Sequence, residues 1–248
     1  MRGSACERHV WVAGRWLTFL PLLSNPSCLA ALVRFRPRLD TVGMRVLARF
    51  LRSSSDVEHF LPPGLPEVAF LGRSNVGKSS VINSLVGKKL ARTSSSPGRT
   101  RSINFFEIRR AGRPKPELVF ADLPGYGYAK VSREVSQEWS RFVDPYLEER
   151  PSLALCLALI DGNIPPQQSD GQLVEFLRSR QRRHVIVATK ADRMSGNDLK
   201  QLMRRLREEH SGAPIVAFSA KTGMGREELW KQIWIAAEEF SGVLDAFG

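Results

Sequence analysis

The sequence predicts an α/β fold with three layers, in which helices cover both faces of a six-stranded, mostly parallel sheet. Short apolar runs alternate with helix-forming stretches between residues 67 and 244, which is the pattern of βαβ units. Four of these runs end in short polar motifs, at the strand ends where open α/β sheets bind their ligands. The turn at residues 110–114 is short enough to require a hairpin, so one edge strand should be antiparallel.

Each expected strand is a short apolar run bounded by turn residues or by a motif, and helices are expected to follow. The expected strands are Glu67 to Leu71, Ile103 to Ile108, Leu118 to Ala121, Leu153 to Ile160, His184 to Thr189 and Pro214 to Phe218. The expected helices are Lys78 to Val86, Arg133 to Glu149, Ser169 to Arg180, Asn197 to Glu209 and Arg226 to Phe240. The predicted organisation is a basic leader at 1–52, an extended lead-in at 53–66, a globular domain at 67–244 and a tail at 245–248.

Residues 72–79 read GRSNVGKS and match the phosphate-binding pattern G-x-x-x-x-G-K-[ST] in the strand-loop-helix context that it needs. Its glycines let backbone N–H groups point at phosphate oxygens beside the positive end of a helix. Lys78 is expected to reach the β- and γ-phosphates, and the Ser79 hydroxyl to ligate Mg²⁺. A glycine turn before a helix capped by Ser79 is the plainer alternative. The predicted contacts are Gly72, Arg73, Ser74, Asn75, Val76, Gly77, Lys78 and Ser79.

Three further motifs follow apolar runs in the order expected of a nucleotide site. Asp122 can hold a metal-bound water while the Gly125 N–H meets the γ-phosphate. Asp192 is an acceptor-only carboxylate that can take two donors from the guanine edge, and adenine lacks this pair, which argues against an ATPase. Each motif taken alone also fits an ordinary turn or helix cap. The predicted contacts are Asp122, Leu123, Pro124, Gly125, Thr189, Lys190, Ala191, Asp192, Phe218, Ser219 and Ala220.

With these motifs in place, the sequence resembles the EngB family (also called YihA or YsxC) of bacterial ribosome-assembly GTPases. The matching stretches are LPEVAFLGRSNVGKSSVINSL, SSSPGRTRSINFFEI, ADLPGYGYAKVS, TKAD and FSAKTGMG, within about Leu65 to Leu244. The resemblance implies a P-loop GTPase fold, GTP and GDP as ligands, and a role in large-subunit assembly linked to cell division and septation. It also implies that Thr100 completes the Mg²⁺ and γ-phosphate contacts. The segment implied to close over the nucleotide is Gly98, Arg99, Thr100, Arg101 and Ser102.

The expected reaction is transfer of the γ-phosphoryl group of GTP to water, with Lys78, Thr100 and Gly125 as the catalytic set. Tyr126 stands where small signalling GTPases place the glutamine that orients the attacking water, so we expect slow intrinsic hydrolysis. Help should then come from a bound K⁺ ion or from a partner. Asn75 is the candidate for K⁺, by analogy with related GTPases, and a loop-stabilising hydrogen bond is the alternative role. A second function remains open, that of a GTP-dependent ribosome-binding checkpoint that hardly hydrolyses GTP.

Two groups of basic residues suggest contact with RNA phosphates. The plainer reading is that these charges are solvated or complement helix dipoles, and the resemblance favours the large ribosomal subunit and its rRNA as partner. We expect no obligate oligomer, and a membrane or septum scaffold is disfavoured because no amphipathic anchor is evident outside the leader. The two groups are Arg99, Arg101, Arg109, Arg110, Arg113 and Lys115, and Arg178, Arg180, Arg182 and Arg183.

The leader holds nine Arg, no Lys, and only Glu7 and Asp40, so it contributes +7 to the chain's net charge of +12. Its apolar stretches are interrupted by Arg15 and two prolines, and none reaches the roughly twenty residues of a membrane helix. We favour a natural start at Met44 or a disordered arm over a mitochondrial leader, and we discount secretion. The three cysteines form no disulfide framework, which fits a reduced, cytoplasmic location.

Overall fold

The computed structural model describes residues 8–12, 15–19, 45–91, 102–125 and 133–247. The chain divides into two units, Met1–Leu39 and Asp40–Gly248. In the first unit, β1 (Arg8–Val12) and β2 (Arg15–Phe19) pair antiparallel as a two-stranded sheet, with Val12 opposite Arg15. The sequence pattern does not predict this pairing.

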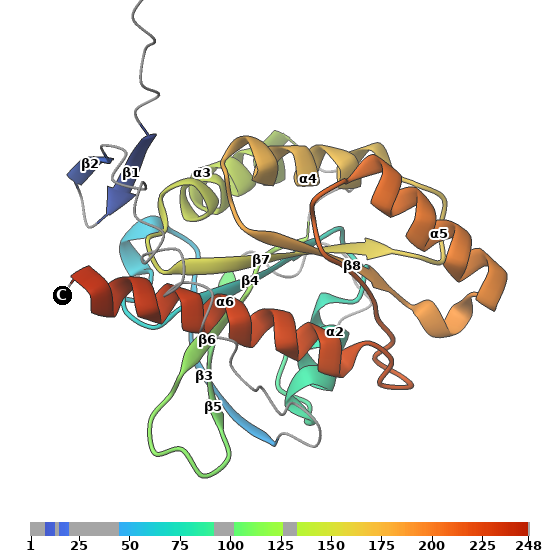
Figure 1. Ribbon diagram of the computed structural model, residues 1–248, viewed down its shortest axis with the longest axis horizontal. Helices are drawn as coiled ribbons and strands as arrows, with labels where there is room; N and C mark the ends of the chain where they lie inside the picture. Colours follow the sequence, from blue (N-terminus) through green and yellow to red (C-terminus); the bar gives the residue numbers. More distant parts are fainter. Residues whose placement is uncertain (1–7, 13–14, 20–44, 92–101, 126–132, 248) are drawn as a thin grey trace, which may run out of the picture. The chain divides into compact units, whose positions relative to one another are not determined.

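The second unit is built around a seven-stranded sheet with strand order β3-β5-β6-β4-β7-β8-β9. The strands are β3 (Val46–Ser54), β4 (Glu67–Gly72), β5 (Ile103–Arg110), β6 (Leu118–Asp122), β7 (Leu153–Asp161), β8 (His184–Thr189) and β9 (Ile215–Ala217). The helices are α2 (Lys78–Val86), α3 (Arg133–Glu149), α4 (Gln168–Ser179), α5 (Gly196–Glu209) and α6 (Arg226–Phe247), with short 3-10 turns η1 (Val57–His59) and η2 (Ala191–Arg193). Helices α3, α4 and α5 cover one face of the sheet, and α2 and α6 cover the other (Figure 1).

The three-layer α/β architecture is confirmed, and the sheet has one strand more than predicted. β5 runs antiparallel to both of its neighbours, β3 and β6, so the reversed strand is second from the edge. β3 takes the edge position and crosses the predicted boundary between leader and lead-in at residues 52 and 53. Two arginines in this strand, Arg49 and Arg52, hide its strand pattern, which becomes evident only from the burial of Val46 and Ala48 against the sheet.

An aromatic core fills the space between the sheet and α6. Phe70 and Phe120 on neighbouring strands are completely buried, with ring centroids 4.8 Å apart. The Phe120 ring stacks on Trp230 of α6 at 5.6 Å, and Trp230 stacks on Trp234 at the same distance. These contacts anchor α6 across β6 and β4, beside α2, the helix that follows the phosphate loop. The Trp230 indole N–H also donates to the Leu85 carbonyl at the end of α2.

A buried ion pair fixes the opposite end of β4. Glu67, the first residue of β4, is 1% exposed and pairs with the guanidinium of Arg150 after α3. The Tyr146 hydroxyl donates to Glu67 Oε2 at 2.7 Å, and burial raises the pKa of this phenol well above its usual value. Because each charged group has hydrogen-bonding partners, the pair can be buried without an uncompensated charge. It holds the amino end of the strand whose carboxyl end carries the GRSNVGKS loop.

The remaining predicted elements lie within a few residues of their observed bounds, and α2, α3 and β8 match at both ends. The largest difference is α6, which continues to Phe247 rather than ending at Phe240. Within the described residues, no helix is both long enough and apolar enough to cross a membrane.

Candidate nucleotide-binding site

The GRSNVGKS segment forms a tight loop between β4 and α2. All six residues of β4 are buried, and the Val81 N–H donates to the Gly77 carbonyl at 2.9 Å in the first turn of α2. The Lys78 ammonium curls back over the loop and donates to the Gly72 carbonyl at 3.0 Å. A loop of this shape, closed at a helix N-terminus with its lysine over it, is a binding site for phosphate groups.

Two glycines are required by this backbone path. Gly77 has φ of +110°, a conformation that side chains with a Cβ disfavour. Gly72 has φ of +153°, and a Cβ there would lie 2.8 Å from the Leu159 carbonyl oxygen of β7 and from the Val76 side chain. The glycines at the ends of the motif therefore permit both the turn and the close contact with β7.

Asp122, at the end of β6, and Lys78 form the charged centre of the site. Asp122 is 5% exposed, and its Oδ1 atom is buried without a hydrogen-bond partner among the described residues. Burial raises the pKa of this carboxyl to about 6, against the opposing effect of the Lys78 charge. Burial likewise lowers the pKa of Lys78, and Asp122 partly offsets that shift. An orphaned carboxylate oxygen beside Lys78 of the phosphate loop fits a hard cation such as Mg²⁺, which takes oxygen ligands.

Gly125 lies directly against the phosphate loop. A Cβ at this position would stand 2.8 Å from both the backbone nitrogen and the hydroxyl of Ser74. Leu123, two residues earlier, is completely buried, and its N–H donates to the Phe70 carbonyl at 3.3 Å, which extends the β4–β6 pairing. The structure therefore brings the DLPG segment and the phosphate loop together, as the motifs predict for a γ-phosphate site.

Asp192 and Ser219 lie together at the end of the site where the sequence predicts base recognition. Asp192 belongs to η2, which follows β8, and Ser219 follows β9. The Ser219 hydroxyl donates to Asp192 Oδ1 at 2.7 Å and accepts hydrogen bonds from the N–H groups of Lys221 and Thr222. The hydrogen bond from Ser219 is the largest cause that lowers the pKa of Asp192, so the carboxylate stays ionised and oriented.

Lys190 connects this end of the site to the phosphate loop. Its ammonium donates to the Asn75 carbonyl at 2.9 Å and to Asp161 Oδ2 at 2.5 Å. The neighbouring Thr189 hydroxyl, which is buried, donates to the Val76 carbonyl at 2.7 Å. Asp161 is missing from the predicted set. Its signal in the sequence is the same as that of Asp122, an acid at the carboxyl end of an apolar run.

Residues 67–190 match the family model described as a 50S ribosome-binding GTPase. A probable GTP-binding protein EngB from Koribacter versatilis is 56% identical over 194 residues, which cover 78% of this chain and 96% of that protein. The chain belongs to the EngB family of P-loop GTPases.

Solved structures agree with the EngB fold. A crystal structure of a probable GTP-binding protein engB matches 70% of this chain and 99% of its own, with a TM-score of 0.55 and 23% identity. Era in complex with MgGDPNP and nucleotides 1506–1542 of 16S ribosomal RNA matches 69% of this chain and 56% of its own, with a TM-score of 0.59 and 25% identity. Because the engB crystal structure is 23% identical to this chain, that similarity supports the fold alone.

Part of the predicted EngB site lies outside the described residues. This part contains Gly98, Arg99, Thr100 and Arg101 of the closing segment, and Tyr126 after the DLPG motif. Ser102 is described, and it lies half-buried directly before β5. The metal-ligand role of Thr100 therefore stays a prediction.

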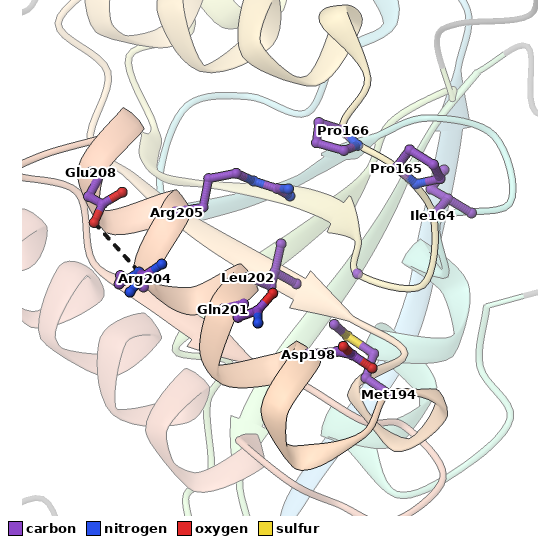
Figure 2. Close-up of a pocket in the computed structure, with 11 residues that line it drawn as sticks. Ile164, Pro165, Pro166, Met194, Asp198, Gln201, Leu202, Arg204, Arg205 and Glu208 are labelled. Carbon is purple, nitrogen blue, oxygen red and sulfur yellow. Dashed lines mark ion pairs between the residues drawn. The ribbon is translucent and has the colours of Figure 1, made fainter.

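A separate pocket of about 380 Å³ lies between the β7–α4 loop and α5 of this EngB-family chain. Figure 2 shows Pro165 and Pro166 of the loop opposite Leu202 and Arg205 of α5, with Arg204 paired to Glu208 at the rim. None of the residues predicted to bind nucleotide lines this pocket. It is therefore distinct from the candidate nucleotide site.

Proposed function

We propose that this EngB-family protein binds GTP together with Mg²⁺, hydrolyses it slowly to GDP, and acts as a nucleotide-dependent switch in assembly of the large ribosomal subunit. The observation that carries the nucleotide assignment is the Asp192–Ser219 pair, held at the same edge of the sheet as the phosphate loop. A fixed, ionised carboxylate can accept the two donors of the guanine edge. Family membership supports GTP as the nucleotide.

In this proposal the loop N–H groups and Lys78 hold the phosphates, while Ser79 and Asp122 hold the metal, directly or through a bound water. The unpartnered Oδ1 atom of Asp122 supports this role, because a buried carboxylate without a partner is costly unless a cation is bound. Bound Mg²⁺ would supply charge neutralisation between the β- and γ-phosphate oxygens. The Gly125 backbone, packed on Ser74, would position the γ-phosphate and respond to its loss.

A bound K⁺ ion beside Asn75 is proposed as the aid to hydrolysis. Asn75 has φ of +64°, and its backbone carbonyl accepts from Lys190. Its exposed side chain has no hydrogen-bond partner among the residues that the structure describes, so the loop-stabilising bond considered above receives no support. The amide oxygen is therefore available for a cation next to the phosphates.

The ribosomal part of the proposal is supported by the family description and by the basic character of the chain. Era, a relative in structure, has been solved with ribosomal RNA nucleotides. A cytoplasmic location and an indirect or direct effect on cell division and septation complete the proposal.

To test the assembly role, the protein is depleted in cells of its source organism and ribosomal particles are separated on sucrose gradients. We expect large-subunit precursors to accumulate, and normal subunit profiles after depletion would contradict the assembly role.

The second candidate function is a GTP-dependent checkpoint that binds the ribosome and hardly hydrolyses GTP. Tyr126, in place of a water-orienting glutamine, favours it. Single-turnover hydrolysis with and without purified large subunits separates the two. Acceleration by the subunits supports a GTPase switch, whereas hydrolysis that stays negligible in both conditions supports the checkpoint.

A further inference from the structure

The edge strand β3 leaves one long side of the sheet open. β3 is first in the strand order and pairs only with β5 among the described strands. Its register shifts between Phe50 and Arg52, which marks a bulge at Leu51. Five of the nine residues of this strand are exposed, while Val46, Ala48 and Ser54 are buried.

Two large apolar side chains project from this strand into solvent. Leu47 is 45% exposed and Phe50 is 50% exposed. The Phe50 ring packs edge-to-face on the buried Phe106 ring of β5, with centroids 5.7 Å apart. This contact holds the Phe50 ring in place while half of its surface stays accessible, which suits an aromatic platform.

Positive charge is concentrated along this edge of the sheet. Residues 45–248 contain 31 Lys and Arg against 23 Asp and Glu, a net charge of +8. Three stretches of this edge, residues 45–54, 87–91 and 103–117, hold nine of these cations and only two acids, Glu107 and Glu117. We call these three stretches the edge surface. Its cations are Arg45, Arg49, Arg52, Lys88, Lys89, Arg109, Arg110, Arg113 and Lys115.

Contacts within the structure join the three stretches into one surface. The Lys88 ammonium donates to the Ala48 carbonyl of β3 at 2.6 Å. The Ala111 N–H of the hairpin turn donates to the Arg45 carbonyl at 2.8 Å. Glu107 pairs with Arg49 and Glu117 pairs with Arg110, so both acids are already engaged. The other seven cations have no ion-paired carboxylate among the described residues, although Lys88, Arg52 and Arg109 donate to backbone carbonyls.

The chemistry of the edge favours nucleic acid over an added protein strand. Arginines on an edge strand and a bulge both discourage pairing with another strand. Lys88 also occupies the Ala48 carbonyl, one of the acceptors that such a strand could use. Phosphates can be neutralised by the surrounding cations, and a base can stack on the exposed Phe50 ring.

We propose that the edge surface binds single-stranded RNA of the ribosomal particle, with Phe50 stacking on a base and the unpaired cations of the surface, Lys89 among them, contacting phosphates. This inference rests on the proposed ribosomal function and specifies which surface performs it. Unpaired bases in loops are the part of RNA that aromatic side chains can stack on. The GTP site and the edge surface share no residue, so variants at the edge should leave GTP binding intact.

The first test uses the full-length chain loaded with a non-hydrolysable GTP analogue. Its affinity is measured for purified large subunits and for a labelled single-stranded RNA of about 20 nucleotides. Phe50→Ala should weaken both affinities about 10-fold, and Phe50→Tyr should restore them because it keeps the ring. Val243→Ala is the matched control, since Val243 on α6 is 51% exposed. Equal affinities for Phe50→Ala and Val243→Ala would overturn the stacking role.

The second test measures the salt dependence of RNA binding. Lys89→Ala should reduce the slope of log affinity against log salt by about 0.7, the value for one lost phosphate contact on a single strand. Lys200→Ala on α5 is the control, because Lys89 and Lys200 are both exposed and neither has a carboxylate partner among the described residues. An unchanged slope for Lys89→Ala, with Phe50→Ala still weakening subunit binding, would replace RNA by a protein partner at this edge.

The two proposals fail in different ways. If the unaltered protein does not bind large subunits, the ribosomal function fails. If it binds and both edge variants bind equally well, only the edge surface is wrong. Thermal unfolding and GTP-analogue affinity are measured for every variant, and if Phe50→Ala does not fold, the Phe50→Tyr and Lys89→Ala results test the edge surface.

Discussion

The Ser219 hydroxyl donates a 2.7 Å hydrogen bond to Asp192 Oδ1 and joins the loops that follow two neighbouring strands, β8 and β9. The same hydroxyl accepts two backbone N–H groups, so its own position is fixed. The carboxylate is thereby held in one orientation before any nucleotide binds. A group that recognises a base benefits from this preorganisation. Because the carboxylate is already ordered, binding the base costs little further side-chain entropy.

Asp192→Asn should change the base preference of the protein. The amide adds a donor where guanine also presents donors, so GTP affinity should fall at least about 100-fold and xanthine triphosphate should bind better than GTP. Competition against a labelled guanine nucleotide measures both affinities. Asp198→Asn, the same exchange on exposed α5, is the control. Unchanged GTP affinity in Asp192→Asn would remove the guanine-reading role.

Asp161→Asn should weaken nucleotide binding without changing base preference. Asp161 accepts from Lys190 at 2.5 Å, and Lys190 also holds the Asn75 carbonyl of the phosphate loop. Loss of the charge should loosen this connection and reduce GTP and xanthine triphosphate affinity by a similar factor of about 10. A preference shift like that of Asp192→Asn would show that Asp161 reads the base itself.

Asp122 should make the stability of the metal-free protein depend on pH. Its folded-state pKa of about 6 lies above its ordinary value of 3.8, so the folded state binds the proton more tightly. Stability should therefore fall as pH rises through this window, by about 3 kcal/mol. Asp122→Asn should remove this loss. Denaturant unfolding in a chelator at several pH values measures the effect, and an identical pH dependence in both proteins would contradict it.

Asp122→Asn should also abolish the Mg²⁺ dependence of GTP affinity. In the unaltered protein that dependence should weaken below about pH 6, because the carboxyl must be ionised to hold the metal. Nucleotide titrations with and without Mg²⁺ measure this. We expect Asp122→Asn to be more stable than the parent at neutral pH and less active in GTP hydrolysis. A gain in stability together with a loss of activity indicates a functional role for Asp122, since loss of a structural group would lower both.

Gly125→Ala should impair hydrolysis more than binding. The added Cβ would lie 2.8 Å from the backbone nitrogen of Ser74, and a backbone atom cannot rotate away. We expect single-turnover hydrolysis to slow at least about 10-fold while GDP affinity stays within about 2-fold. Gly171→Ala on α4 is the control, because a Cβ there meets nothing within 4 Å. Equal hydrolysis rates in the two variants would show that the Gly125 contact can relax.

Potassium should accelerate hydrolysis through Asn75. Turnover is compared in buffers matched except for K⁺ or Na⁺, with an expected difference of about 10-fold that Asn75→Ala abolishes. The reason is an added positive charge beside the phosphates, where charge develops during transfer. Equal turnover in the two salts would show that K⁺ does not activate hydrolysis, and a partner would then be the expected activator.

The parts of the fold that could be predicted are those with strong local signals. The apolar β4 run, the glycine loop and α2 follow directly from neighbouring residues, and the observed bounds of α2 match the prediction. β3 could not be predicted in this way, because its arginines obscure the alternation and its pairing partners in β5 lie 49 to 64 residues away along the chain. Asp161 carries the same signal as Asp122, an acid at the end of an apolar run, but its contact with Lys190 depends on the parallel pairing of β7 with β8.

Co-sedimentation with purified ribosomal subunits tests whether the protein binds the large subunit in a nucleotide-dependent way. The protein is loaded with GDP or with a non-hydrolysable GTP analogue, and each form is centrifuged with large or small subunits at two salt concentrations. We expect the triphosphate form to bind the large subunit, and this binding to weaken at higher salt. The GDP form should bind little. Absence of binding in both forms would contradict a ribosomal switch and leave a GTPase that acts on a different partner.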